Sequence, residues 1–156
     1  MQSKNTHQAQ IWQEYEKFVK DYELTLKNNK PFHEIVKEIM KDRNLTIEQL
    51  VDKSGLATQT VHRLRSGKTK NNKGVEVEYF PYLNTIISFA IACDLDMLMT
   101  ITLLDSLGYG FRRTYDVHYA YCYLIVNCRG KSISECNEVL EQLGIDEKYQ
   151  LRDIEK

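Results

Sequence analysis

A short stretch near the middle of the chain gathers cationic side chains and excludes acidic ones. Between Asp52 and Glu76 there is no acidic residue, although the whole chain carries 22 acidic residues against 21 Lys and Arg. Lysine and arginine bind phosphate groups, and a cluster of one charge sign concentrates a polyanion around it. The stretch therefore indicates a surface for a polyanion, with a merely solvated basic loop as the alternative. The cationic side chains after residue 60 are Arg63, Arg65, Lys68, Lys70 and Lys73.

The charge of the chain is unevenly distributed around this stretch. Residues 31–73 carry nine Lys or Arg and five acidic residues, whereas residues 74–156 carry seven Lys or Arg and thirteen acidic residues. A basic centre thus precedes an acidic C-terminal part. The overall net charge of −1 conceals the positive charge of residues 31–73 and the negative charge of residues 74–156. A binding partner would interact with the local charge of one segment and not with the net charge of the chain.

No other set of residues has the pattern of a reactive site. The chain lacks a glycine-rich phosphate loop, a CxxC pair and any Ser/His/Asp or Cys/His motif. His118 and Cys122 have the i, i+4 spacing of two metal ligands on a helix, but buried free cysteine is the commoner role. Asp94 and Asp96 are typical of a helix-capping junction. The sequence predicts no enzyme, no cofactor and no metal site.

Length and composition indicate a water-soluble protein with one helical core. A chain of 156 residues with only 7 Gly and 2 Pro offers few turns for a many-stranded sheet. No apolar run approaches the roughly 20 residues of a membrane span, and the polar first residues lack the apolar segment of a secretory signal peptide. We therefore predict an all-α protein in the cytoplasm, without membrane contact and with reduced cysteines.

Hydrophobic periodicity, capping residues and breakers divide the chain into helices. A basic polar loop is predicted over 67–76 and a frayed end over 148–156. The segment 94–107 has β-branched residues that also permit a strand. Thr46 is the expected N-cap of one short helix, and either Ser132 or Ser134 that of the last. Helices are predicted over about 10–27, 31–44, 47–54, 58–65, 79–93, 94–107, 117–128 and 132–144.

Residues 45–68, LTIEQLVDKSGLATQTVHRLRSGK, combine two short helices with a tight turn at Gly55. Apolar residues hold the two helices at a fixed angle and leave the outer face of the second one open. This pattern resembles the lambda-repressor-like, or Xre-type, family of bacterial and phage regulators, over about residues 31–108. The positions that carry the resemblance are Leu45-Thr46, Leu50-Val51, Gly55-Leu56, Thr60-Val61, Leu64 and Ser66-Gly67.

The resemblance implies a five-helix domain that places its second short helix in the major groove of double-stranded DNA. By the same resemblance, Thr58, Gln59 and Arg63 occupy base-contacting positions, with His62 beside them. Thr46 and Thr60 occupy positions that meet phosphates at helix starts. The backbone contacts beyond them fall to Arg65, Lys68, Lys70 and Lys73. The alternative is that Thr58 and Gln59 are ordinary solvent-facing residues.

The sequence departs from the family pattern in three places. Ile47 stands where the family often has a Gln that braces the recognition helix. Arg65 stands where an acidic residue is frequent, and the following loop is long, with its proline delayed to Pro81. The last two departures add positive charge, which favours polyanion binding.

Two further segments flank this domain. Residues 1–30 are predicted to form an amphipathic helix with an apolar face that includes Trp12 and Phe18. Residues 109–156 resemble the two-helix C-terminal extension of many regulators of this type. A buried Asn137 would need a partner and is expected to tie the last two helices together. The extension also carries a tyrosine cluster, Tyr115, Tyr119, Tyr121 and Tyr123.

Together these features predict a sequence-specific DNA-binding transcriptional regulator, a repressor, that acts as a homodimer. Two alternatives belong to other classes. One is a protein-interaction module, such as an antitoxin or a phage-encoded regulator, that binds a protein partner through its acidic helical tail. The other is a ligand-sensing regulator with a pocket between the DNA-binding motif and the tail.

Overall fold

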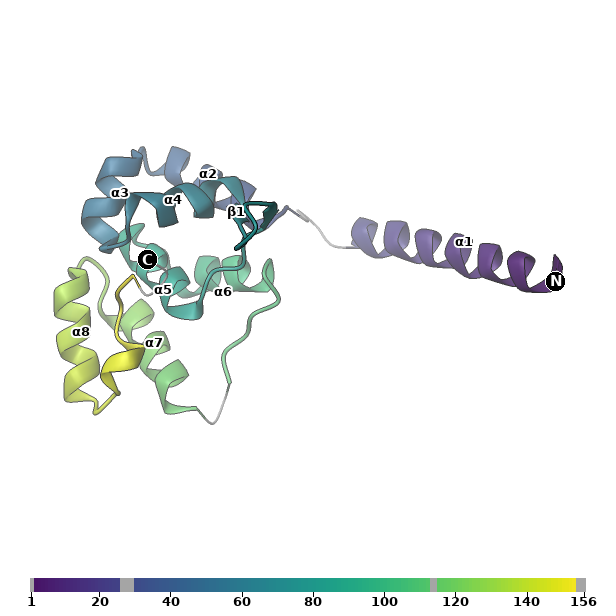
Figure 1. Cartoon of the computed structure of the whole chain (residues 1–156). Coiled ribbons are helices and arrows are strands. Elements are labelled where there is room, and N and C mark those ends of the chain that lie inside the picture. The colour runs from purple at the N-terminus through teal and green to yellow at the C-terminus, as the bar shows by residue number, and fades with distance from the viewer. Residues whose placement is uncertain (1, 26–29, 113–114, 154–156) are drawn as a thin grey trace. The chain divides into compact units, whose positions relative to one another are not determined.

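The computed structural model describes residues 2–25, 30–112 and 115–153 (Figure 1). It confirms the all-α class, because the described sheet is a single two-stranded hairpin. Two compact units are present, residues 1–30 and residues 31–156. In chain order the elements are α1 Gln2–Thr25, α2 Phe32–Asp42, α3 Ile47–Ser54, α4 Thr58–Ser66, β1 Lys68–Lys70, β2 Glu76–Glu78, α5 Leu83–Ala92, α6 Met97–Asp105, α7 Asp116–Asn127, α8 Ile133–Gln142 and the 3₁₀ turn η1 Glu147–Tyr149.

The first unit is the single helix α1. It begins earlier than the predicted range of 10–27, and Leu26 lies outside the described residues. Apolar side chains along its middle are exposed, and the Trp12 ring meets the Tyr15 ring edge to face at 5.7 Å. Among the side chains of α1 that the structure describes, the large exposed apolar ones are Ile11, Trp12, Tyr15 and Phe18.

Local capping chemistry sets the ends of several helices in the second unit. Thr46 and Gln49 form a capping box at the start of α3, and Ser132 and Glu135 form one at the start of α8. Asp96 caps α6 by accepting a hydrogen bond from Met99 N–H at 2.8 Å. The segment 94–107 is therefore helical over Met97–Asp105 and contains no strand, and the helix begins three residues later than predicted. Asp94 instead forms an exposed ion pair with Arg129 at 3.2 Å.

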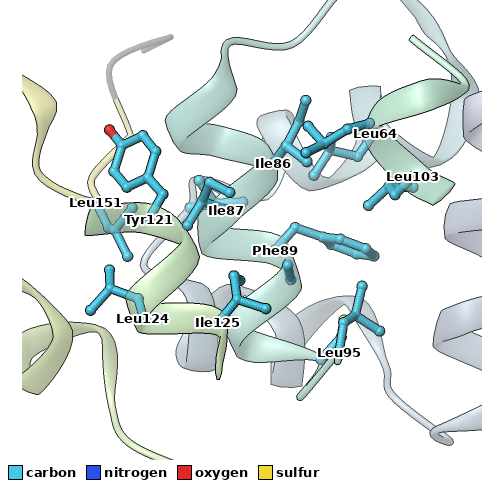
Figure 2. Packing of buried hydrophobic residues seen from close by; sticks show 14 of the residues in the cluster. Leu64, Ile86, Ile87, Phe89, Leu95, Leu103, Tyr121, Leu124, Ile125 and Leu151 are labelled. Atoms are coloured by element: carbon cyan, nitrogen blue, oxygen red, sulfur yellow. The ribbon is translucent and has the colours of Figure 1, made fainter. Parts of the chain in front are cut away.

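Helix α5 is the centre of the second unit. Residues 84–90 of this helix are all buried, including the polar side chains of Asn84, Thr85 and Ser88. It packs against α3 and α6 on one side and against α7 and α8 on the other. Figure 2 shows Ile86 on the side toward Leu64, and Ile87 on the side toward Tyr121 and Leu151. A helix that is apolar around its circumference belongs in a core, and the core of the second unit is continuous through it.

The C-terminal segment is tied down as far as Asp153, so the prediction of a frayed end is wrong for the described part. Leu151 is 1% exposed, and both of its backbone polar groups bond to Asn137: Leu151 N–H donates to Oδ1 at 2.7 Å, and Nδ2 donates to Leu151 O at 3.0 Å. Asn137 therefore ties α8 to this segment, and not to α7 as expected. The Tyr121 hydroxyl also donates to the carbonyl of Tyr149 at 2.5 Å. We call residues 149–153 the C-terminal strap.

The described residues contain no group of three or more His, Cys, Asp and Glu side chains arranged to hold a metal ion. His118 Nδ1 accepts a hydrogen bond from the Arg112 N–H at 2.8 Å. No helix in the described ranges is both long enough and apolar enough to cross a bilayer.

The four cysteines differ in burial, and this predicts their order of reaction. Cys93, Cys128 and Cys136 are buried, whereas Cys122 is half-buried. Burial raises the pKa of Cys93 to about 12 and that of Cys136 to about 11. It also raises the pKa of the half-buried Cys122, so the greater exposure of Cys122 carries the expected difference in rate. Because the thiolate is the nucleophile, iodoacetamide should modify Cys122 of the native chain at least about tenfold faster than Cys93 or Cys136. Timed alkylation followed by mass spectrometry measures this order.

Urea-unfolded protein provides the control, in which all four thiols should react at similar rates. Native-state labelling of Cys93 as fast as Cys122 would show that the core around α5 is not closed in solution.

Candidate nucleic-acid interface

Helix α4 has one buried side and one exposed side. Val61 and Leu64 are fully buried, and Thr60 is 1% exposed. Thr58, Gln59 and His62 are exposed, and Arg63 is half-buried. The helical repeat thus brings the three predicted base-contacting residues, Thr58, Gln59 and Arg63, to the outer side of α4 together with His62. We call Thr58, Gln59, His62 and Arg63 the reading face.

The turn between α3 and α4 is fixed by its own contacts. Gly55 adopts φ +71°, which ends α3 in a left-handed conformation suited to glycine. The Ser54 hydroxyl oxygen accepts a hydrogen bond from Leu56 N–H at 3.1 Å, and both residues are buried. Leu50 of α3 is fully buried as well, and α3 packs on both α4 and α5. The orientation of α4 is therefore set by the core.

The predicted basic loop over 67–76 is wrong at its ends, because residues 68–70 and 76–78 pair as the antiparallel strands β1 and β2, and only residues 71–75 form the connecting turn. Lys68 lies opposite Glu78, and Lys70 lies opposite Glu76. At the base of the hairpin the Tyr79 N–H donates to Gly67 O at 2.9 Å, and the buried Tyr79 ring joins the core. Pairing between the strands gives hydrogen-bond partners to the backbone N–H and C=O groups of this polar, mostly exposed segment.

The tip of the hairpin is closed by Asn71. Its side-chain oxygen accepts hydrogen bonds from Lys73 N–H at 2.9 Å and from Val75 N–H at 3.0 Å. Gly74 adopts φ +74° within this turn. Asparagine commonly organises turns in this way. Lys73 is therefore presented on an ordered turn.

Pairing of the strands changes the electrostatics that the sequence suggests. Lys68 forms an ion pair with Glu76 at 3.6 Å, and both side chains are largely exposed. Each lysine of β1 thus faces an acidic residue of β2, although the linear sequence around it is free of acids. Lys73 stands in the turn beyond the last cross-strand pair. The positive field of the hairpin is consequently strongest at its tip.

A shallow hollow beside the start of α3 brings a second group of cations together. Thr46 and Arg65, two of the predicted phosphate contacts, line it with Glu48. Lys37 and Lys41 of α2 line the same hollow, and the sequence analysis did not select them. Their i, i+4 spacing on one helix face is the signal that was available. The Nε atom of Arg65 is buried and has no hydrogen-bond partner among the described residues.

Thr60 is separated from the other predicted contacts. Its hydroxyl donates to Asp153 Oδ2 at 2.8 Å, and the same oxygen accepts the Ala57 N–H at 2.6 Å. In this structure the Thr60 side chain is thus occupied by a residue of the C-terminal strap. Nothing in the local sequence of α4 indicates this partner, which lies 93 positions further along the chain.

Two short helices joined by a glycine turn, with an exposed face on the second one, define a helix-turn-helix unit. Residues 36–78 match the family model of the Cro/C1-type HTH DNA-binding domain, which confirms the resemblance to Xre-type regulators. The match runs from α2 through the end of β2. Comparisons with curated proteins and with solved structures gave no significant match. A domain of this type supports a DNA-binding regulator in general terms and is not an enzyme family.

Gly67, at the end of α4, provides a test of how the helix-turn-helix unit is held on α2. It adopts φ +72°, and a Cβ at this position would lie 2.7 Å from Nδ1 of His33. Gly67→Ala should lower the free energy of unfolding by the left-handed backbone cost of about 1–3 kcal/mol, plus the cost of displacing His33. Urea unfolding monitored by circular dichroism measures the loss.

Gly74→Ala is the matched control, since Gly74 has φ +74° and nothing within 4 Å of its added Cβ. Equal losses for the two variants would contradict a close contact between Gly67 and His33.

Proposed function

We propose that this protein is a sequence-specific transcriptional repressor that binds double-stranded DNA and places α4 in the major groove. The observation that carries the proposal is the reading face, which lies over the buried Val61 and Leu64 inside the Cro/C1-type segment. A helix fits the major groove, and residues near its N-terminus reach base edges. Occupation of an operator would block transcription from it. A cytoplasmic location belongs to the same proposal.

The side chains of the reading face suit direct contacts with bases. Gln59 can pair with adenine through two hydrogen bonds, and Arg63 can do the same with guanine. Thr58 contributes a hydroxyl and a methyl group, and His62 lies beside it. All four are carried by a helix whose opposite side is buried, so their backbone positions are set by the core before DNA arrives.

Two groups of cations outside the reading face support contacts with the DNA backbone. Lys37, Lys41 and Arg65 converge beside Thr46 at the start of α3, where the helix terminus also favours an anion. The second group is on the hairpin, which presents Lys70 and Lys73. Phosphate contacts of this kind set the register of a protein on DNA without reading its sequence.

A homodimer would give the protein useful specificity, because one recognition helix covers only a few base pairs. Two copies related by a two-fold axis would read half-sites about 34 Å apart. Exposed apolar residues suggest two candidate dimer surfaces. One is the aromatic face of α1, and the other is the α7 face that carries Tyr119, Tyr123 and Val126.

A protein partner is the second candidate function, and one observation favours it. Glu135, Glu138 and Glu141 are all exposed on α8, where their spacing places them near one another. This acidic row lies within the C-terminal part that carries thirteen acidic residues. A basic protein surface would fit it.

Selection from random duplex DNA tests the primary proposal. The full chain should enrich a palindromic sequence with half-sites one helical turn apart when selection is carried out at about 150 mM salt. Sequencing of the bound fraction gives the site. Weak, salt-sensitive binding with no enriched sequence would contradict a sequence-specific regulator and favour the protein-partner function.

Two substitutions should separate base contacts from backbone contacts. Arg63→Ala should cost about 1–3 kcal/mol of binding free energy at one base position and relax specificity there. Lys73→Ala should weaken binding to all sequences alike and reduce the slope of log K against log salt by about one. Fluorescence anisotropy titrations across salt concentrations measure both effects.

Lys68→Ala is the matched control for Lys73, because Lys68 is already paired with Glu76 and should change the slope less. If Arg63→Ala weakens every sequence equally, Arg63 is a phosphate contact and not a base contact.

A further inference from the structure

The first turn of α4 is completed by a residue from the far end of the chain. Helices α3 and α8 each close their first turn with their own residues, Thr46 with Gln49 and Ser132 with Glu135. Helix α4 has Ala57 at its N-cap and forms no side-chain cap there. The Asp153 carboxylate accepts the Ala57 N–H at 2.6 Å, the position that the third-residue Glu or Gln takes in a capping box.

The C-terminal strap holds Asp153 in this place. Leu151, two residues earlier, is buried and bonded to Asn137 through both of its backbone groups. Two residues of extended chain span at most about 7 Å. Asp153 therefore stays close to the first turn of α4 for as long as Leu151 remains in the core.

The contact puts a negative charge beside the surface that faces DNA in the proposed function. Thr58 and Gln59, the first residues of the reading face, follow Ala57 directly in the chain. Asp153 Oδ2 also accepts a hydrogen bond from the Thr60 hydroxyl at 2.8 Å. A carboxylate next to bound DNA repels the phosphates and cancels part of the positive potential at the helix start.

We propose that the contact between Asp153 and α4 is autoinhibitory. The C-terminal strap holds the negative charge of Asp153 against the first turn of α4, and this charge lowers the affinity of the reading face for DNA. The inference rests on the proposed function, since it concerns how tightly the same face binds. Withdrawal of the strap, or loss of the charge, raises the affinity. In this way the C-terminal extension acts on DNA binding without contacting a base.

The test is Asp153→Asn in the full chain, which keeps a side-chain oxygen for the Ala57 N–H and removes the charge. Anisotropy titration of a labelled duplex of mixed sequence, at about 100 mM salt, should show binding about five- to tenfold tighter than wild type. The gain should shrink as salt is added, because it is electrostatic in origin.

Asp146→Asn is the matched control. It makes the same change in net charge, and Asp146 accepts its hydrogen bond from the nearby Lys148 N–H at 3.0 Å, within η1 and not at α4. This variant should bind within about twofold of wild type if the charge acts locally.

The outcomes separate this inference from the proposed function. Equal gains for Asp153→Asn and Asp146→Asn, or no gain for either, would overturn the autoinhibitory contact while DNA binding itself stands. Weaker binding by Asp153→Asn would also overturn it and assign Asp153 to holding α4 in position. Failure of wild type and of both variants to bind any duplex would instead refute the proposed function.

Discussion

Burial of α5 is the constraint on which the rest of the second unit depends. Its residues 84–90 have no solvent-facing side, so the helix can exist only where other elements cover it completely. Helix α3 covers one side and supports α4, while α7 and α8 cover another. The helix-turn-helix and the C-terminal extension therefore share one core. The extension is thus connected to α4 by packing through α5 and α3 as well as by the strap.

The interface shows why the sum of charges in a segment is a poor guide to its field. In the linear sequence the lysines of β1 lie far from any acid. Strand pairing places Glu76 and Glu78 opposite them, and the cross-strand ion pair takes up part of their charge. Arg65, by contrast, joins Lys37 and Lys41 beside α3 and adds to a field that the sequence distributes over two distant segments. The proposed backbone contacts follow this folded distribution.

The C-terminal strap connects the two halves of the second unit in a different way from the core. Its anchor is apolar and buried at Leu151, whereas its end is a carboxylate on the first turn of the recognition helix. Because Leu151 is anchored only two residues before it, Asp153 has little conformational freedom. The contact with α4 therefore costs little of the conformational entropy that ordering a long flexible segment would cost. In the proposed autoinhibition, a small movement of this one short segment is what changes the affinity for DNA.

Several features of this protein were determined by the sequence alone because they depend on neighbours in the chain. Apolar periodicity predicted the helices, Thr46 marked one helix start, and Gly55 marked the turn that defines the helix-turn-helix. For the last helix the sequence offered Ser132 or Ser134, and the structure selects Ser132. The buried positions Val61 and Leu64 also implied which side of α4 is exposed. The fold class and the exposed side of α4 follow from these local rules, whereas the assignment of base contacts to that side came from the family resemblance.

Other features were decided only by the tertiary structure. The hairpin pairs Lys68 with Glu78, and the sequence between them contains no strong two-residue turn motif that would predict this pairing. The hollow at α3 needs α2 to bring Lys37 and Lys41 beside Arg65. The contact between Asp153 and Ala57 spans 96 positions and exists because a shared core brings the end of the chain to α4. Such contacts are set by packing between distant segments, which local periodicity and propensity do not encode.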